Sequence, residues 1–203
     1  MNKQAIKYLP LGDSYTIGEL VKEEERWPNI LVENLKLNGI NIEIICNPSV
    51  TGYTTQNLID NELPIFIDKK PNFCTLLIGV NDWVQEVDIN IYRNNLIYII
   101  DKVLEILPSK ERLILVTIPD FGKTPEGNKY SKGRDISEGI LEFNEVIKNI
   151  ALSRNIAIAD IFEVSQKAEN DINYVAEDGL HPSYLQYKEW EKLVFPLAIK
   201  TLK

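Results

Sequence analysis

The chain is poor in the residues that build metal sites and disulfide frameworks: its 203 residues include one histidine and two cysteines. Cys46, Cys74 and His181 are too few to complete a zinc site. Each cysteine lies in an apolar stretch that predicts a strand, and a chain of this length needs no disulfide to fold. We therefore expect two buried free thiols and no bound metal.

Long apolar runs and an excess of basic residues are also lacking. No apolar run is long enough to span a bilayer, which predicts no stable membrane insertion. Residues 1–7 lack the apolar core of a secretion signal, so we expect a cytoplasmic protein. The net charge of −8 argues against a nucleic-acid partner, because an acidic chain gains nothing from releasing the counterions of a polyphosphate.

The composition that remains is that of a globular protein, with 44% hydrophobic and 26% charged residues. No repeat, low-complexity segment or linker interrupts the sequence, which predicts a single domain over residues 1–203. Five apolar runs predict strands, at Ile6–Leu11, Ile42–Cys46, Phe73–Ile78, Leu113–Ile118 and Ile156–Ile161. Their apolar residues are continuous instead of alternating, as in strands that a parallel sheet buries on both faces.

Helical patterns separate these strands. Apolar residues recur at helical spacing in three stripes, which are Leu96, Ile100, Val103, Leu104 and Leu107, then Ile140, Phe143, Ile147, Ile150 and Ala151, then Trp190, Leu193, Val194, Leu197 and Ala198. The alternation predicts an α/β fold with a doubly wound parallel sheet, in which ligands gather at the carboxyl ends of the strands. One long irregular segment, residues 119–134, is typical of a binding loop or lid.

The single histidine follows an aspartate by three residues, in the stretch Asp178-Gly179-Leu180-His181. One tight turn can bring the Asp178 carboxylate to Nδ1 of His181, which fixes the tautomer and leaves Nε2 free to accept a proton. Pro182 suits the first turn of the helix that follows, which would anchor the histidine at its start. Considered alone, His181 also fits an ordinary position at the boundary between a loop and a helix.

Three further polar positions follow the first three predicted strands. Ser14 lies in a strand-to-helix turn that would expose its side chain and point backbone N–H groups at the same place. Gly52 would let its backbone N–H approach a substrate with no side chain in the way, and the Asn81 amide could donate to a developing negative charge. Taken singly, each of these residues also fits a helix cap or a turn.

Taken together, four blocks of the sequence resemble the SGNH (GDSL-like) hydrolase family, which is named for its invariant Ser, Gly, Asn and His. They are GDSY at 12–15, Gly52 in a polar loop, GVND at 79–82 and DGLH at 178–181, and they run from the first predicted strand to the last helix. The resemblance implies a three-layer α/β/α sandwich with a flavodoxin-like five-stranded parallel sheet, and it requires no metal or organic cofactor. Tyr15 departs from the usual leucine of the GDSL block, which bears on the subfamily and not on the chemistry.

The resemblance also implies roles for the residues of these blocks. Ser14 would be the nucleophile of a serine esterase and form an acyl-enzyme, with His181 as general base and then acid, oriented by Asp178. The oxyanion hole would consist of the Ser14 N–H, the Gly52 N–H and the Asn81 side chain.

Less follows about the substrate. Members of the family cleave acyl groups from sugars, lysophospholipids, thioesters and small synthetic esters, and we expect a small-molecule or carbohydrate ester with a small acyl group such as acetyl. Tyr53 and Trp83 lie close after oxyanion-hole residues, so they are candidates either for the wall of a substrate pocket or for core packing. We expect Asp13 and Asp82 to brace their loops.

The segment 119–134 carries four cationic side chains, which are Lys123, Lys129, Lys132 and Arg134. They could meet an anionic group of a substrate, or simply be solvated surface residues.

Three other functions fit parts of the pattern. The same fold could serve as a non-catalytic binding module, although the intact set of site residues argues against that. An acyltransferase would use the same first half-reaction and pass the acyl group to an acceptor other than water. A flavodoxin-like flavin or phosphate binder would need a Ser/Thr/Gly-rich loop after the first strand, where this chain has the acidic Asp13. The sequence specifies no oligomeric state.

Overall fold

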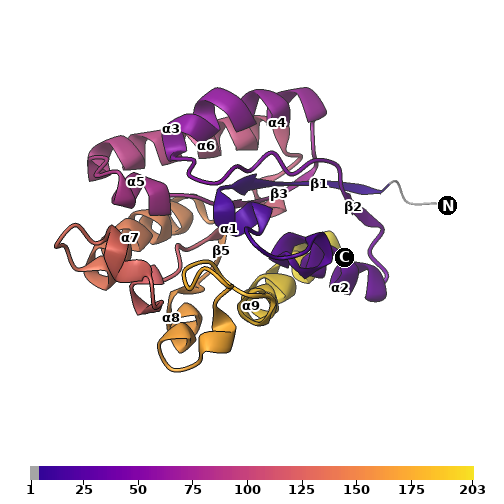
Figure 1. The fold of residues 1–203 in the computed structure, drawn as a ribbon. Helices are drawn as coiled ribbons and strands as arrows, with labels where there is room; N and C mark the ends of the chain where they lie inside the picture. The colour runs from indigo at the N-terminus through magenta and orange to yellow at the C-terminus, as the bar shows by residue number, and fades with distance from the viewer. Residues whose placement is uncertain (1–4) are drawn as a thin grey trace.

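Five parallel strands form one sheet in the order β2-β1-β3-β4-β5 (Figure 1). The computed structural model describes residues 5–203. The strands are β1 (Ile6–Gly12), β2 (Ile42–Ile44), β3 (Phe73–Leu77), β4 (Leu113–Val116) and β5 (Ala157–Ala159). This order is that of flavodoxin-like folds, so the predicted α/β architecture is confirmed.

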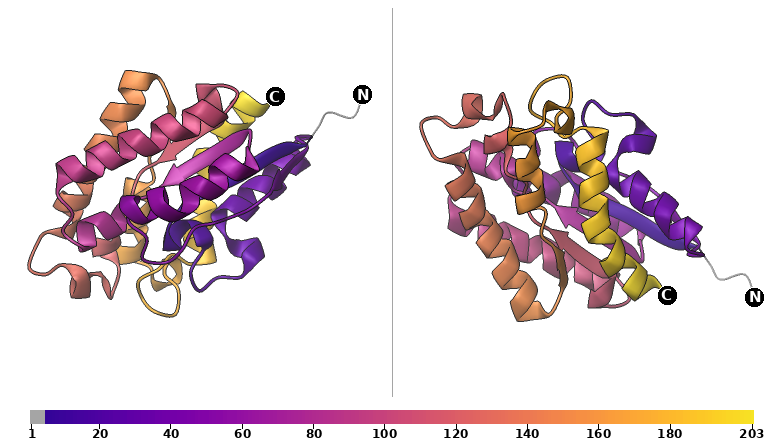
Figure 2. Two further views of the ribbon diagram at one scale, coloured as in Figure 1. Left: turned by 90° about the horizontal axis from the view of Figure 1, so that it is seen from above. Right: turned by 90° about the horizontal axis from the view of Figure 1, so that it is seen from below.

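Helices cover both faces of the sheet, as Figures 1 and 2 show. They are α1 (Ser14–Ile17), α2 (Trp27–Leu37), α3 (Thr55–Asn57), α4 (Leu63–Lys69), α5 (Val80–Val84), α6 (Ile89–Ile106), α7 (Ile136–Arg154), α8 (Phe162–Ser165) and α9 (Tyr184–Leu202). The two helices α2 and α9 pack together on one face, whereas α4, α6 and α7 line the other. A π-helical turn, η2 (Leu58–Glu62), joins α3 to α4.

The central strands β3 and β4 are buried along their whole length, as their continuous apolar runs predict. The edge strands are shorter than predicted, because each pairs with its single neighbour over three residues only. β2 pairs with β1 up to Tyr8↔Ile44, and β5 pairs with β4 up to Val116↔Ala159. Cys46 therefore lies beyond β2 and is only partly buried, whereas Cys74 is buried in β3. Both thiols are free.

The helical stripes predicted for α6 and α7 supply much of the core, and Leu96, Ile100 and Val103 are each at most 2% exposed. The stripe predicted for α9 is too wide. Trp190 and Val194 are buried, but Leu193 is 39% exposed. The reason is that the buried face of α9 runs through positions 187, 190, 191, 194 and 198, which turns Leu193 toward solvent.

None of the helices within residues 5–203 has both the length and the apolar character that crossing a bilayer demands.

Candidate active site

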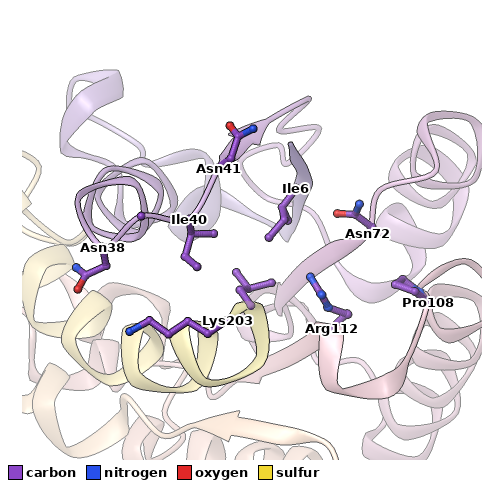
Figure 3. A pocket seen from close by; sticks show the side chains of 10 residues that line it. Ile6, Asn38, Ile40, Asn41, Asn72, Pro108, Arg112 and Lys203 are labelled. Atoms are coloured by element: carbon purple, nitrogen blue, oxygen red, sulfur yellow. The ribbon is translucent and has the colours of Figure 1, made fainter. Parts of the chain in front are cut away.

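Two cavities lie at opposite ends of the strands of the sheet, and their linings differ in chemistry. The larger, about 550 Å³, lies where the strands begin and is lined by residues such as Ile6, Asn72 and Arg112 (Figure 3). Among its described lining residues there is no serine, threonine, cysteine or histidine. The smaller, about 230 Å³, is lined at the carboxyl edge by Ser14, Gly52, Asn81 and His181. Reactive side chains, and not volume, therefore mark the carboxyl edge as the candidate active site.

Ser14 lies in a tight turn at the end of β1. Asp13 caps α1 by accepting a hydrogen bond from the Tyr15 N–H at 3.0 Å, and Ser14 is the first residue of that helix. A side chain at Gly12 would place its Cβ 2.4 Å from the carbonyl oxygen of Leu77, so only glycine fits there. This turn holds Ser14 at the cavity with 5% of its surface exposed.

Two carboxyl groups support the site from inside the protein. Burial raises the pKa of Asp13 to about 8, against the hydrogen bond from Tyr15, which lowers it, and with the nearby Asp82 charge raising it further. Asp82 accepts hydrogen bonds from the N–H of Thr55 at 2.8 Å and from its hydroxyl at 2.5 Å. Burial raises the pKa of Asp82 to about 6 in spite of these bonds. Both side chains brace loops, as expected.

Asp178 and His181 form the predicted pair. Nδ1 of His181 lies 2.6 Å from Oδ2 of Asp178, while Oδ1 accepts the backbone N–H groups of Leu180 and His181, each at 3.0 Å. Partial burial alone would raise the pKa of Asp178, but these hydrogen bonds outweigh it and hold the pKa below its usual value. An ionised Asp178 that accepts the Nδ1 proton leaves Nε2 of His181 as the free base.

The anchoring of His181 differs from the prediction. Helix α9 begins at Tyr184 with Ser183 as its N-cap, so Pro182 precedes the helix and does not lie in its first turn. Instead, Pro182 pairs with Val175 in an isolated β-bridge, and the His181 carbonyl accepts the Ala176 N–H at 2.7 Å. A short backbone ladder therefore positions the histidine.

Gly52 faces the same cavity from the loop after β2, and Asn81 faces it from α5, which follows β3. The Asn81 amide donates one hydrogen to the Tyr53 carbonyl at 3.0 Å, which orients the amide and leaves its second hydrogen unused by that bond. Gly52 has a φ of +85°, yet a Cβ placed there would meet nothing within 4 Å. The backbone conformation therefore favours glycine here, whereas crowding from the protein does not, and the approach of its N–H to a substrate stays a prediction.

Apolar side chains outside the predicted site residues form much of the cavity wall. They are Tyr15, Val80, Val84, Phe121, Tyr130 and Leu180. The signal for two of them was present, because Phe121 and Tyr130 belong to the segment 119–134 that was predicted to be a binding loop or lid.

Tyr53 and Trp83, by contrast, do not line this cavity. Trp83 is 5% exposed, its ring contacts Phe121 at a centroid distance of 5.8 Å, and the Arg134 guanidinium lies 3.8 Å from its centre. Of the two alternatives, the structure therefore favours packing for Trp83.

The cations of the same segment are already engaged. Three lysines form ion pairs with acidic residues, and the pairs are Lys123–Glu169, Lys129–Glu126 and Lys132–Glu86. Arg134 donates to the Trp83 carbonyl at 2.9 Å in addition to stacking on its ring. The segment consequently presents paired charges and not a cluster of open cations.

The comparison with known families agrees with this geometry. The model of the GDSL-like lipase/acylhydrolase family matches residues 11–188, which span every block of the site. The chain belongs to this family. The predicted family is therefore confirmed, and with it the prediction of a carboxylic ester hydrolase class.

Relatives of this GDSL-like chain include two curated esterases. A multidomain esterase from Ruminococcus flavefaciens is 29% identical over 92% of this chain, which spans only 28% of that protein's length. An arylesterase from Vibrio mimicus is 26% identical over 87% of this chain and 80% of its own. Among solved structures, a lipase/acylhydrolase from Enterococcus faecalis matches with a TM-score of 0.80 at 21% identity, over 98% of this chain and 97% of that one. An acetyl xylan esterase from Geobacillus stearothermophilus matches with a TM-score of 0.72 at 18% identity, over 95% and 94% of the two chains.

Proposed function

We propose that this protein is a serine esterase that hydrolyses a small-molecule or carbohydrate ester with a small acyl group, such as acetyl, through Ser14, His181 and Asp178. The observation that carries the proposal is one cavity lined by Ser14, Gly52, Asn81 and His181, in which the histidine is bonded to Asp178.

The reaction takes place in two halves. Ser14 Oγ attacks the ester carbonyl while Nε2 of His181 takes the hydroxyl proton, and the carbonyl oxygen becomes an oxyanion. The backbone N–H groups of Ser14 and Gly52 and the Asn81 amide donate to that oxyanion, and one such donor contributes about 3 kcal/mol. Collapse of the intermediate breaks the ester C–O bond, and His181 returns the proton to the departing alcohol. Water then attacks the acyl-enzyme by the same steps and releases the acid.

The size and character of the cavity favour a short acyl chain. Its volume of about 230 Å³ is below the roughly 300 Å³ at which pockets for larger ligands begin. Apolar rings from Phe121 and Tyr130 close it on the side of the segment 119–134. The acetyl xylan esterase among the structural neighbours is consistent with such a substrate.

The test is hydrolysis of p-nitrophenyl acetate by the purified protein and by Ser14→Ala and His181→Ala. We expect each substitution to lower kcat by at least about 10³-fold with the circular dichroism spectrum unchanged. Ser153→Ala, on the surface of α7, is the matched control and should retain wild-type activity. An inert wild-type protein, or activity that survives Ser14→Ala, contradicts the proposal and favours a non-catalytic binding module.

A further inference from the structure

Glu62 is a fully buried acidic residue close to the nucleophile turn. It ends the π-helical turn η2 and has no exposed surface. Its Oε2 accepts a hydrogen bond from the backbone N–H of Gly12 at 3.1 Å. Its other oxygen, Oε1, has no hydrogen-bond partner within residues 5–203. A buried carboxyl that makes one backbone bond is a costly feature, so its position needs an explanation.

The explanation begins with a gap in the sheet. The Tyr8 carbonyl accepts the N–H of Ile45 just past β2, and alternate residues of a strand direct their backbone groups to the same side. Pro10 and Gly12 therefore face the β2 side as well, but β2 pairs no farther than Tyr8. Pro10 has no N–H to satisfy. Gly12 has one, and Glu62 accepts it in place of the missing strand.

The segment that carries Glu62 also contacts the oxyanion side of the site. Residues 52–62 begin with Gly52 at the cavity, continue through Thr55, which is bonded to Asp82 beside Asn81, and end at Glu62, which is bonded to Gly12. One short stretch of chain thus connects the Ser14 turn to both other oxyanion donors.

We propose that Glu62 is a positioning residue for Ser14, whose bond to the Gly12 N–H fixes the Gly12–Ser14 turn against the segment that carries Gly52. This inference rests on the proposed function, because it assigns Ser14 as the nucleophile. Misplacing a nucleophile by about 1 Å lowers turnover by roughly 100-fold and leaves substrate binding largely intact.

Burial raises the pKa of Glu62, the Gly12 bond opposes that rise, and the Asp13 carboxyl adds to it. The uncharged acid is therefore favoured, and glutamine is its closest mimic, since its amide oxygen can accept the same N–H.

The experiment compares kcat and KM for p-nitrophenyl acetate in Glu62→Ala, Glu62→Gln and Glu62→Asp, well below the melting temperature of each variant. We expect Glu62→Ala and Glu62→Asp to lower kcat by roughly 10- to 100-fold with KM within about threefold of wild type. Glu62→Gln should restore kcat to within about threefold, because it keeps the acceptor at the same distance.

The matched control is Glu191→Ala. Glu191 is 4% exposed on α9, and burial raises its pKa too, but it does not line the cavity. We expect a loss of stability there with kcat unchanged. Equal effects of Glu62→Ala and Glu191→Ala on kcat would overturn the proposal. If Glu62→Ala fails to fold, the comparison is between Glu62→Gln and Glu62→Asp, and equal kcat values for these two variants would overturn it. Ser14→Ala, measured alongside, separates this result from failure of the esterase assignment. Activity that survives Ser14→Ala contradicts the esterase assignment, whereas an inert Ser14→Ala variant leaves that assignment standing when the Glu62 comparison fails.

Discussion

Asp13 combines two properties at the scale of a single residue: it caps the turn that presents Ser14, and it is entirely buried. Its pKa is about 8 in the folded protein against 3.8 as the ordinary value. Between these pH values the folded state holds a proton that the unfolded state has released. The stability linked to Asp13 is therefore fully present below pH 3.8 and is lost as pH rises through about 8. Asp82, with a pKa of about 6, acts in the same direction.

We predict that the free energy of unfolding falls between pH 5 and pH 8, and that Asp13→Asn reduces the fall. Each buried group contributes at most about 1.4 kcal/mol per pH unit. Asparagine keeps an acceptor for the Tyr15 N–H and has no proton to lose. Urea unfolding followed by circular dichroism at several pH values measures the slope.

The same exchange at Asp135, the exposed cap of α7, is the control for the substitution itself. A slope equal to wild type in Asp13→Asn would show that Asp13 is ionised in the folded protein.

The site residues differ in how far the sequence could predict them. The contact between Asp178 and His181 could be predicted, because three residues of separation fit one turn. The orientation of Trp83 could not be predicted, because the direction of a side chain depends on its place in a helix. Successive residues of α5 turn by about 100°, so Trp83 points away from the face on which Asn81 lies. The proposed role of Glu62 could not be predicted from the sequence, since it depends on the edge strand β2 ending before it reaches Gly12.

The segment 119–134 is a wall held in place at the scale of secondary-structure elements. Asp120 is buried, and its carboxylate accepts the Ser137 hydroxyl at 2.8 Å and the Gln166 amide at 2.9 Å. The Glu126 N–H donates to the Gly179 carbonyl at 3.1 Å, which links the wall to the histidine loop. Arg134 fastens the far end to α5. We therefore expect the segment to form a fixed boundary of the cavity that is proposed to bind the acyl group.

Tyr130→Ala should widen that pocket and shift acyl preference toward longer chains. We expect the ratio of kcat/KM for p-nitrophenyl hexanoate to that for the acetate to rise by roughly 10-fold, because the space left by the ring accommodates one or two of the added methylenes at about 0.8 kcal/mol each. A series of p-nitrophenyl esters measures the ratio. Tyr98→Ala, an exposed tyrosine on α6, is the control and should leave it unchanged. An unchanged ratio in Tyr130→Ala would exclude this side chain as a limit on acyl length.

The end of a strand could be predicted from the sequence only where residues within the strand determine it, and not where a distant side chain does. The run Leu113–Ile118 predicts a strand of that length, but β4 ends at Val116. Beyond it, the Ile118 N–H donates to the Asn144 side chain at 2.7 Å, and the Ile118 carbonyl accepts from the same amide at 2.9 Å. A residue of α7 thus takes over from the sheet, and apolar periodicity contains no information about such a partner.

The whole molecule has a net charge of −8, and the lysines of the segment 119–134 are already paired with acidic residues. The long-range field therefore repels anionic substrates. We predict that kcat/KM for an anionic ester, such as p-nitrophenyl hemisuccinate, rises roughly two- to fivefold between low and high salt, because salt screens this repulsion. The neutral p-nitrophenyl acetate should change little. Equal salt responses of the two esters would argue that the local field at the cavity is neutral.

The strand order is a feature of the whole molecule that the residues alone do not predict. Apolar runs separated by helical stripes predict a doubly wound sheet, but not which strands are neighbours. The order β2-β1-β3-β4-β5 places the loops after β1, β2 and β3 side by side, which is why Ser14, Gly52 and Asn81 meet.

The histidine loop reaches this group from the opposite end of the chain, and this has a consequence for biosynthesis. Ser14, Gly52 and Asn81 leave the ribosome well before Asp178 and His181, which emerge just before α9. Because a domain folds as a unit, the proposed nucleophile and oxyanion donors can meet their proposed base only after the segment that follows β5 has been made. A shorter nascent chain would thus hold Ser14 without its proposed base, and the proposed reactivity would arise only after α9 has been made.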